Sequence, residues 1–316
     1  MSVSIPVRVA ATEDLTPRIK LFTLVSVDGS RLPAFTAGSH IAVETTGGME
    51  RQYSICNDPS ETDRYLIAVQ CELDGRGGSK WMHENVCVGD TLRIKPPLNN
   101  FPLGEKATHH LLIAGGIGVT PILSMARDLA RRCQSFDIVY LSRSKPEAAF
   151  LDVFASDPFA GRTTLHHDLE AGQAFDLAAV LGQVSEGAHI YCCGPAGLMK
   201  AVEQLTKGRA AHTVHFEKFS NDISSHQSGD RPLSVVLAKS KTTVDVRAEQ
   251  TILDALLEHG IDVDYSCCEG TCGTCVVKLL DGIADHRDAV LSDDEKGKLI
   301  AICCSRAKTP SLTLDI

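Results

Sequence analysis

The chain has 316 residues, of which 43% are hydrophobic and 22% charged, and its formal net charge is −9. This length predicts two or three domains with cores of their own. The acidic balance argues against nucleic acid or an anionic membrane as a partner, because either would need a basic face. The sequence has neither an apolar stretch of the roughly 18 residues that span a membrane nor the pattern of a signal peptide. We therefore expect a cytoplasmic protein.

The first segment, residues 1–104, alternates hydrophobic and polar side chains in short runs. Three of these runs lie at residues 40–44, 64–70 and 90–95, and Gly, Pro and Asp separate them. Short strands at this spacing predict an antiparallel barrel or sandwich. We assign residues 1–104 to this first domain.

The second segment, residues 105–219, alternates buried strands with amphipathic helices. We expect strands at residues 111–114, 137–141, 163–166 and 189–193, and helices at residues 121–132, 146–154, 175–181 and 196–205. This alternation predicts an α/β domain with a parallel sheet.

The third segment begins with a polar, turn-rich stretch, residues 220–232, which we interpret as a linker. Residues 233–316 then form a small α+β domain of the β-grasp kind. Its expected elements are a hairpin (233–237 and 243–247), a helix (251–258) that Gly260 ends, and a final strand (311–316). The predicted fold class is thus multi-domain: a β-barrel, a parallel α/β domain and an α+β domain.

Four of the twelve cysteines have the C-x4-C-x2-C…C spacing of a plant-type 2Fe–2S site, namely Cys267, Cys272, Cys275 and Cys303. Three thiolates from one tight loop need a backbone that folds closely around the inorganic sulfides. Gly270 and Gly273 supply this freedom, because they reach positive φ at little cost and let amides point toward sulfur. A structural zinc site would usually show two C-x2-C pairs, so the spacing favours the iron–sulfur cluster.

Two of these ligands have a cysteine neighbour that competes with them. Cys303 is preferred to Cys304 because the apolar run 299–302 delivers it as a strand end, and Cys267 is preferred to Cys268 because only three residues separate Cys268 from the next cysteine. Other cysteines are predicted to be small buried hydrophobic residues, namely Cys56, Cys71, Cys87, Cys133 and Cys192.

The first domain carries two motifs that suit a flavin. Arg51-Gln-Tyr53-Ser54 places a cation, an aromatic ring and a hydroxyl on one strand end. FMN needs a phosphate partner, a stacking surface and a hydrogen bond near the reactive N5. The glycine turn Gly75-Arg-Gly77-Gly78-Ser79 runs into an expected helix, whose first amides can cap a phosphate.

The second domain carries two similar strand-to-helix turns, Gly115-Gly-Ile-Gly-Val-Thr-Pro121 and Cys193-Gly-Pro195. Both lie at the carboxyl edge of the predicted sheet, where ligands bind, and their glycines let a dinucleotide pyrophosphate approach the backbone. Pro121 stands where the strict G-x-G-x-x-G fingerprint has its last glycine, so the first turn is not a Rossmann match. Cys193 either packs in the core or faces a nicotinamide.

In this order, the motifs resemble the family of phthalate dioxygenase reductase, the one-chain reductases that feed Rieske-type aromatic oxygenases and O-demethylases. The resemblance implies a ferredoxin-reductase-like FMN barrel, an NAD domain and a plant-type ferredoxin domain. It implies FMN contacts from Arg51, Tyr53, Ser54, Ala68, Val69, Gly77, Gly78, Ser79 and Thr120, with Phe219 over the flavin ring. It implies contacts with the nicotinamide nucleotide from Gly116, Gly118, Cys193, Gly194 and Pro195.

The activity implied is hydride transfer from NADH to FMN, followed by single-electron steps through the cluster to a separate Rieske-type oxygenase. No side chain is then needed as a general base, and Thr120, Cys193 and Phe219 are expected near the flavin and the nicotinamide. We expect a monomer. An alternative is a self-contained flavin and iron–sulfur oxidoreductase that reduces its own small acceptor.

The choice between NADH and NADPH stays open from the residues alone. The strand 138–141 ends in Ser142-Arg143-Ser144, with no acidic residue to hold a ribose 2′-hydroxyl. An arginine at this place can accommodate a 2′-phosphate. The resemblance nevertheless favours NADH.

Overall fold

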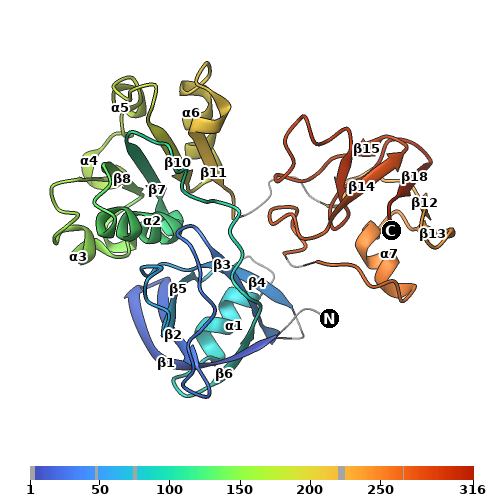
Figure 1. Cartoon of the computed structure of the whole chain (residues 1–316), viewed down its shortest axis with the longest axis horizontal. Helices are drawn as coiled ribbons and strands as arrows, with labels where there is room; N and C mark the ends of the chain where they lie inside the picture. Colours follow the sequence, from blue (N-terminus) through green and yellow to red (C-terminus); the bar gives the residue numbers. More distant parts are fainter. Residues whose placement is uncertain (1–3, 47–48, 74–76, 220–224, 266) are drawn as a thin grey trace. The chain divides into compact units, whose positions relative to one another are not determined.

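The computed structural model describes residues 4–46, 49–73, 77–219, 225–265 and 267–316. The chain divides into two compact units, Met1–Glu217 and Lys218–Ile316 (Figure 1). The first unit contains an antiparallel sheet and a parallel sheet, and the second contains a mixed sheet. The predicted multi-domain class is confirmed. None of the helices in the described residues is long and apolar enough to cross a membrane.

The antiparallel sheet has six strands in the order β4-β3-β6-β1-β2-β5. A bridge between Ile55 and Ile67 joins the end of β4 to β5 and closes the sheet into a barrel. The strands are β1 (Ile5–Thr16), β2 (Ile19–Ser26), β3 (His40–Glu44), β4 (Glu50–Ser54), β5 (Arg64–Gln70) and β6 (Thr91–Ile94), and the helix α1 (Gly78–Asn85) follows β5. This confirms the predicted barrel.

The parallel sheet has five strands in the order β11-β10-β7-β8-β9. The chain starts in the middle at β7, moves outward through β8 and β9, and then returns to the other side of β7 at β10. The carboxyl ends of β7 and β10 therefore flank the point where the strand order reverses, which is where open α/β sheets bind ligands. The strands are β7 (His110–Gly115), β8 (Phe136–Ser142), β9 (Thr163–His167), β10 (His189–Cys193) and β11 (Val214–Glu217).

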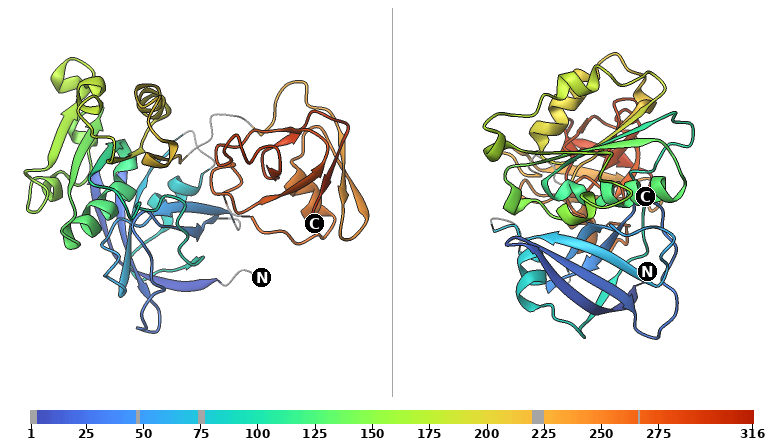
Figure 2. Two further views of the ribbon diagram at one scale, coloured as in Figure 1. Left: turned by 45° about the horizontal axis from the view of Figure 1, so that its top comes forward. Right: turned by 90° about the vertical axis from the view of Figure 1, so that its left-hand side faces the viewer.

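Helices cover both faces of this sheet (Figures 1 and 2). On one face, Leu112 and Tyr140 pack in the cluster that contains α2 (Val119–Arg131). On the other face, Ile113 and Val139 pack with Met199 of α6 (Ala196–Leu205). The three central strands β7, β8 and β10 are buried on both faces and have hydrophobic side chains in most positions, as such strands need. The shorter helices are α3 (Leu151–Phe154), α4 (Asp168–Ala171) and α5 (Leu177–Leu181), with 3-10 turns at Gly116–Gly118, Lys145–Glu147 and Ala211–Thr213.

One predicted helix, residues 146–154, is broken in the structure. It consists of the 3-10 turn Lys145–Glu147 and the short helix α3. Phe150 separates the two with φ at 62°, a left-handed conformation that no helix continues through. The buried side chain of Phe150 belongs to the core below α2, so tertiary packing overrides the local helical pattern here.

The parallel sheet docks on the barrel through α2. Ser124 Oγ donates to the Asn57 carbonyl oxygen at 2.9 Å, and Arg127 donates to the Cys56 carbonyl oxygen at 2.7 Å. Arg131 reaches the carboxylate of Asp58 at 3.2 Å. Ala68 of the barrel lies in the same hydrophobic cluster as the buried side of α2. These contacts explain why the two predicted domains form one compact unit.

The second unit contains a five-stranded sheet in the order β13-β12-β18-β14-β16 and the helix α7 (Ile252–Glu258). Thr251 and Asp254 form a capping box at the start of α7, and Gly260 follows its end with φ at 70°. The strands are β12 (Leu233–Leu237), β13 (Thr242–Val246), β14 (Val276–Asp281), β15 (Ala284–Asp285), β16 (Leu299–Ala301), β17 (Arg306–Ala307) and β18 (Ser311–Leu314). Hairpin, helix and last strand are confirmed.

The burial predicted for the additional cysteines is partly wrong. Cys56 and Cys192 are buried, and Cys71 is half-buried, but Cys87 and Cys133 are exposed. Cys87 lies in the turn that follows α1. Cys133 follows the end of α2 with φ at 52°, so it leaves the helix at the surface. Their positions at helix ends, rather than their hydrophobicity, decide their exposure.

We predict that Gly118→Ala destabilises the first unit. A Cβ at Gly118 would lie 2.2 Å from the Cys193 carbonyl oxygen and 2.7 Å from the Gly194 nitrogen, so the two turns would have to separate. A cost of roughly 1–3 kcal/mol is expected for such overpacking. Gly197→Ala is the control, because a Cβ there meets nothing within 4 Å and lies in α6. Thermal unfolding of both variants is the measurement, and an equal Tm for the two would contradict the prediction.

Candidate cofactor and electron-transfer sites

The residues predicted to bind a phosphate lie together where β4 meets the start of α1. Gly77 precedes the helix with φ at 89°. A Cβ at Gly78 would lie 2.7 Å from Cγ of Arg51, so the arginine side chain crosses directly over the first turn of the helix. A guanidinium and the first amides of a helix together favour a phosphate group. Gly75 and Arg76, also in the predicted glycine motif, lie outside the described residues.

The two residues that follow Arg51 in the motif have buried polar atoms. The hydroxyl of Tyr53 is buried and has no hydrogen-bond partner among the described residues, and burial raises its pKa. Such an orphaned group fits a site that a polar ligand completes. Ser54 is 4% exposed, and its hydroxyl donates to Glu217 at 3.4 Å. The chain therefore has the cation, the ring and the hydroxyl that a flavin needs, grouped on one strand.

The other predicted flavin contacts are less direct. The side chain of Val69 lies in the barrel core, so only its backbone is available to a ligand. Its carbonyl oxygen is 2.8 Å from Nε2 of His83. Thr120 is buried at the start of α2, where its hydroxyl donates to the Ile117 carbonyl oxygen at 3.0 Å. Ser79 accepts a hydrogen bond from the amide of Glu72 at 3.0 Å.

The two strand-to-helix turns of the second domain pack backbone against backbone. A Cβ on Gly194 would lie 2.9 Å from Cα of Gly115, and one on Gly118 would touch the Cys193 carbonyl oxygen. Gly116 has φ at 53° and open space where a Cβ would be. The turns thus leave exposed backbone at the switch point of the sheet, where a pyrophosphate can approach closely. Pro195 precedes α6 in the same turn.

Glu217 is a site residue that the sequence analysis missed. It is the last residue of β11 and pairs with Cys193 of β10. Although part of the residue is exposed, its carboxyl group lies among protein atoms, and this burial raises its pKa to about 8. Burial also raises the pKa of the Cys193 thiol. A neutral carboxyl, a neutral thiol and the hydroxyl of Ser54 therefore meet where the sheet edge faces the barrel.

The sequence held a weak signal for Glu217. An acidic residue at the end of a hydrophobic strand, beside the strand that ends in Cys193, is in the right register to reach a ligand at that edge. The register itself, Cys193 opposite Glu217, becomes visible only once the parallel pairing of β10 and β11 is known. The hydrogen bond to Ser54 spans 163 positions of the chain and depends on how the barrel and the sheet dock.

Two further predicted residues have exposed side chains, Arg143 and Phe219. Arg143 follows β8, its side chain is exposed, and its carbonyl oxygen accepts from the amide of Leu169 at 3.0 Å. Phe219 is 41% exposed and belongs to the second unit. The roles predicted for both stay predictions.

The cysteine loop brings the four predicted ligands together. The thiol of Cys267 is within hydrogen-bond reach of Cys272 and Cys303, and Cys275 is within reach of Cys303. All four side chains are buried. Four thiols that converge in this way suit the coordination of two irons.

Backbone amides point at these sulfurs, as the sequence predicts. The amide of Glu269 donates to Cys267 Sγ at 3.3 Å, and that of Thr274 donates to Cys272 Sγ at 3.5 Å. Gly270 and Gly273 have φ at 71° and 76°, which confirms their predicted conformation. Such N–H groups stabilise the negative charge of thiolate ligands. Ser266 lies outside the described residues.

The rival cysteines are placed differently. Cys304 Sγ lies 3.8 Å from the Ala301 carbonyl oxygen, and a Cβ at Gly270 would be 2.5 Å from that sulfur. Cys304 thus fills the space below the loop glycine. Cys268 is only half-buried and has φ at 54°. This arrangement supports Cys303 and Cys267 as the ligands.

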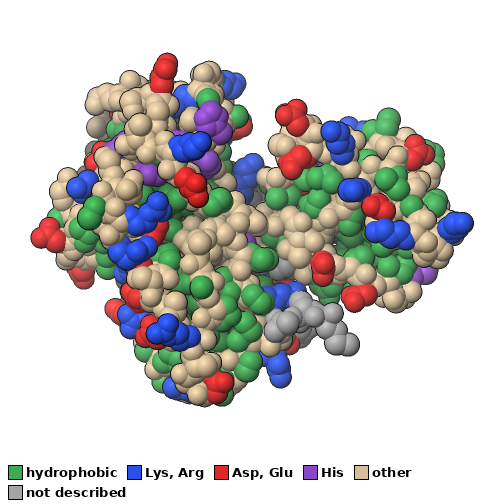
Figure 3. Space-filling view, viewed as in Figure 1, with side chains coloured by type: hydrophobic (Ala, Val, Ile, Leu, Met, Phe, Trp, Pro, Cys, Tyr) green, Lys and Arg blue, Asp and Glu red, His purple; other side chains and the backbone are tan. Residues whose placement is uncertain are grey.

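Charged side chains of both signs occur on the surface of the protein. On the face drawn in Figure 3, acidic and basic side chains are interspersed over each unit. Nucleic acid would need basic side chains gathered on one face.

Comparison with known families gives two matches. The family described as 2Fe-2S iron-sulfur cluster binding domain matches residues 235–308, which include the four predicted ligands. The N-terminal domain of dimethylamine monooxygenase subunit DmmA-like proteins matches residues 90–212. The iron–sulfur match establishes a 2Fe–2S domain in the second unit.

Full-length relatives extend the similarity to the whole chain. Phthalate dioxygenase reductase of Burkholderia cepacia is 40% identical over 311 residues, which cover 98% of this chain and 96% of the relative. The carnitine monooxygenase reductase subunit of Escherichia coli (strain K12) is 41% identical over 318 residues, 98% of each chain. A solved phthalate dioxygenase reductase, described as a modular structure for electron transfer from pyridine nucleotides to 2Fe–2S, superposes with a TM-score of 0.79 at 40% identity over 99% of this chain and 98% of that one. This chain therefore belongs to the phthalate dioxygenase reductase family.

Proposed function

We propose that the chain is the reductase component of a Rieske-type aromatic-ring oxygenase or O-demethylase system. It is an NADH-dependent flavin and iron–sulfur reductase that transfers electrons. The observation that carries the proposal is the combination of three sites in one chain: the Arg51 phosphate site, the glycine turns of the parallel sheet, and the four-cysteine loop. The proposal is supported by the superposition of 99% of the chain on a relative described as moving electrons from pyridine nucleotides to 2Fe–2S.

FMN is the flavin that the barrel is proposed to hold. Arg51 and the first residues of α1, Gly77 to Ser79, would bind its single phosphate. Tyr53 would stack on the ring system, and its orphaned hydroxyl would gain a partner. Ser54, Ala68, Val69 and Thr120 would line the rest of the site, with Phe219 covering the ring. A bound flavin accepts two electrons together as a hydride and passes them on one at a time.

The nucleotide is proposed to lie along the carboxyl edge of the parallel sheet. Gly116, Gly118, Gly194 and Pro195 would offer backbone to its phosphates, and Cys193 would lie near the nicotinamide. Arg143 would lie near the adenosine ribose. Glu217 would hold a proton beside Ser54, so that the edge where hydride passes carries no charge near neutral pH.

The cluster domain is the proposed exit for electrons. Cys267, Cys272, Cys275 and Cys303 would hold the two irons, and the domain would pass single electrons to a separate oxygenase. The named substrates of the relatives differ, phthalate in one and carnitine in another. This supports a division of labour in which the oxygenase selects the substrate. We propose that the chain acts as a monomer.

The order of electron flow is tested with Cys275→Ser. The variant is expected to lose iron and sulfide but to retain FMN, because Cys275 lies in one compact unit and Arg51 and Tyr53, proposed to bind FMN, lie in the other. NADH oxidation with ferricyanide should persist through the flavin, and cytochrome c reduction should fall by at least tenfold. Cys304→Ser is the matched control and should keep the cluster. Loss of both activities in a folded Cys275→Ser protein, or release of FAD, would refute this assignment.

The nucleotide preference is tested with Arg143→Ala. The wild-type protein is expected to prefer NADH and to tolerate NADPH. Because a guanidinium pairs with a 2′-phosphate but gains little from a hydroxyl, kcat/KM for NADPH should fall by about 1–3 kcal/mol more than that for NADH. Arg162→Ala, in the same unit, is the control. An equal decrease in kcat/KM for the two nucleotides would show that Arg143 does not contact the 2′ position of the ribose.

The role of Glu217 is tested by the pH dependence of stability. Its pKa is about 8 in the folded protein, above the roughly 4.3 of an unfolded chain. Between these values the folded state binds the additional proton, so the free energy of unfolding should decrease as pH rises, by at most about 1.4 kcal/mol per unit. Above pH 8 this decrease should stop.

Glu217→Gln removes the titrating group, so its free energy of unfolding should decrease less with rising pH than that of the wild type. The measurement is urea unfolding of the flavin-free protein between pH 5 and 9, with Glu44→Gln as an exposed control in β3. Identical pH profiles for wild type and Glu217→Gln would rule out the proposed buried carboxyl.

A further inference from the structure

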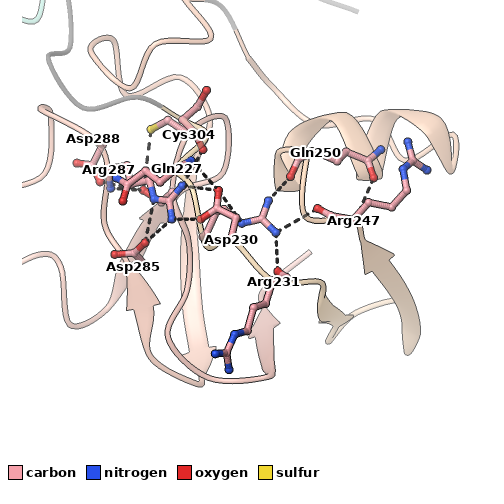
Figure 4. Close-up of polar contacts among 12 residues, drawn as sticks. Gln227, Asp230, Arg231, Arg247, Gln250, Asp285, Arg287, Asp288 and Cys304 are labelled. Carbon is pink, nitrogen blue, oxygen red and sulfur yellow. Dashed lines mark hydrogen bonds and ion pairs between the residues drawn. The ribbon is translucent and has the colours of Figure 1, made fainter.

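The sequence predicts a linker at residues 220–232. Part of this segment is bound firmly by the second unit. Residues 225–232 precede β12. Two buried arginines of the iron–sulfur domain, Arg287 and Arg306, bind this segment at both ends. Figure 4 shows Arg287 between Asp230 and Asp285. We call residues 225–231 the anchored segment.

Arg287 binds the anchored segment with an unusually complete set of contacts. Its guanidinium donates to both carboxylate oxygens of Asp230, at 2.9 and 2.5 Å, and to the Ser225 carbonyl oxygen at 2.9 Å. Nε and the second amino group also donate to Asp285, at 2.8 and 2.7 Å. All five N–H groups of the guanidinium are thereby used. The side chains of Arg287 and Asp230 are only 5% and 9% exposed, so this is a buried bidentate pair.

Arg306 holds the other end of the anchored segment. Its side chain is 2% exposed and donates to the carbonyl oxygens of Arg231 at 2.9 Å, of Arg247 at 3.1 Å and of Gln250. Its Nε lies 3.7 Å from Asp230. Asp230 is thus enclosed by two guanidiniums, and the hydrogen bonds from Arg287 hold its pKa at about 2.

The anchored segment also closes on itself. The amide of Gln227 donates to the Asp230 carboxylate at 3.0 Å, and the amide of Asp230 donates to the Gln227 carbonyl oxygen at 3.1 Å. The segment is therefore a folded turn around one charged side chain. Loss of the Asp230 charge would weaken its contacts with Arg287 and the bond from Gln227 together, because the charge assists all of them.

The segment that carries Arg287, directly after β15, also supports the cysteine loop. The amide of Arg287 donates to Ser305 Oγ at 3.1 Å, and Ser305 donates to the carboxylate of Asp288 at 3.2 Å. Two residues beyond Arg287, the amide of Ala289 donates to the Gly270 carbonyl oxygen of the cysteine loop at 2.9 Å. The anchor is thus built on the same rigid part of the domain that surrounds the cluster.

We propose that Asp230 and Arg287 are positioning residues for electron transfer from the flavin to the cluster, because they set the length of the chain that joins the two units. With the anchor formed, the connection from Glu217 at the end of β11 to Ser225 is residues 218–224. Without it, the connection extends to Leu233 at the start of β12 and comprises residues 218–232. The proposal rests on the proposed function for what is transferred.

The two lengths have different consequences. At about 3.5 Å per residue, the anchored connection can reach at most about 28 Å and the released one about 56 Å. The effective concentration of one tethered site at another falls roughly as the −3/2 power of tether length. Doubling the length therefore predicts a roughly threefold slower encounter between flavin and cluster.

The chemistry of the anchor suits a positioning role. A buried ion pair is a poor source of net stability, because desolvation offsets the attraction, whereas it specifies one arrangement strictly. Hydrophobic side chains could have attached the segment with less geometric precision. A bidentate arginine with five filled donors fixes both the position and the direction of the entering chain.

The experiment uses the full-length protein with its cofactors and three variants. Asp230→Asn removes the charge at nearly constant shape. Insertion of eight Gly and Ser residues after Asp222 lengthens the connection and leaves the anchor intact. Asp245→Asn is the control, because Asp245 is an exposed aspartate of the same domain that accepts from Ser234 at 2.8 Å. Hydrogen exchange of residues 225–231 reports the anchor, and stopped-flow absorbance after mixing with NADH reports flavin and cluster reduction separately.

Asp230→Asn is expected to speed exchange in the anchored segment at least tenfold and to slow cluster reduction about threefold, while flavin reduction and iron content stay unchanged. The insertion should slow cluster reduction by a similar factor without changing the exchange, and Asp245→Asn should match the wild type. If hydrogen exchange of residues 225–231 in Asp230→Asn were as slow as in the wild type, the proposed anchor would be overturned. Unchanged cluster reduction in the insertion variant would overturn the role of tether length. A wild-type cluster that NADH does not reduce would instead refute the proposed function, and the exchange measurement would still test the anchor.

Discussion

The contact between two glycine turns at the carboxyl edge of the parallel sheet determines the geometry of the first unit. Gly118 lies so close to the Cys193 carbonyl oxygen that no Cβ fits between them. This contact sets where α2 begins, and α2 in turn carries the side chains that bind the barrel segment around Asn57. The same edge ends in Glu217, which reaches Ser54 of the barrel. The residues proposed to bind the flavin and those proposed to bind the nucleotide therefore meet along an edge that is packed at backbone distance.

The structure of the second unit depends on the charge of the cluster that it binds. A thiolate-bound cluster carries negative charge, and the loop that holds it must supply N–H groups without burying unpaired ones. Gly270 and Gly273 let the backbone turn so that amides face Cys267 and Cys272. The core of the domain lies beneath this loop, and the buried arginines on its flank attach the incoming chain. Neighbouring parts of this small domain therefore hold the cluster ligands and bind the incoming chain.

The sequence predicts most of this fold because its signals are local. The cysteine spacing, the strand–helix alternation and the glycine that ends the helix at Gly260 each lie within a short stretch, and most of the elements formed where they were expected. The helix predicted at residues 146–154 does not form as one element, because the burial of Phe150, a tertiary effect, outweighs the local helical pattern. The exposed Cys87 and Cys133 were misjudged for a related reason, since burial depends on where a helix ends in space.

The site residues that sequence reasoning missed all act across long sequence separations. Glu217 depends on the pairing of β10 with β11 and on the docking of the barrel. Asp230 lies in a stretch whose composition is typical of a linker, and its partner Arg287 is 57 positions away. A polar segment with a few charged residues looks the same in a free linker and in an anchored one, because the difference lies entirely in what the rest of the chain places beside it. Since electrons must pass between two separately folded units, such a long-range ion pair is also where the chain can adjust the rate of that passage without altering either redox site.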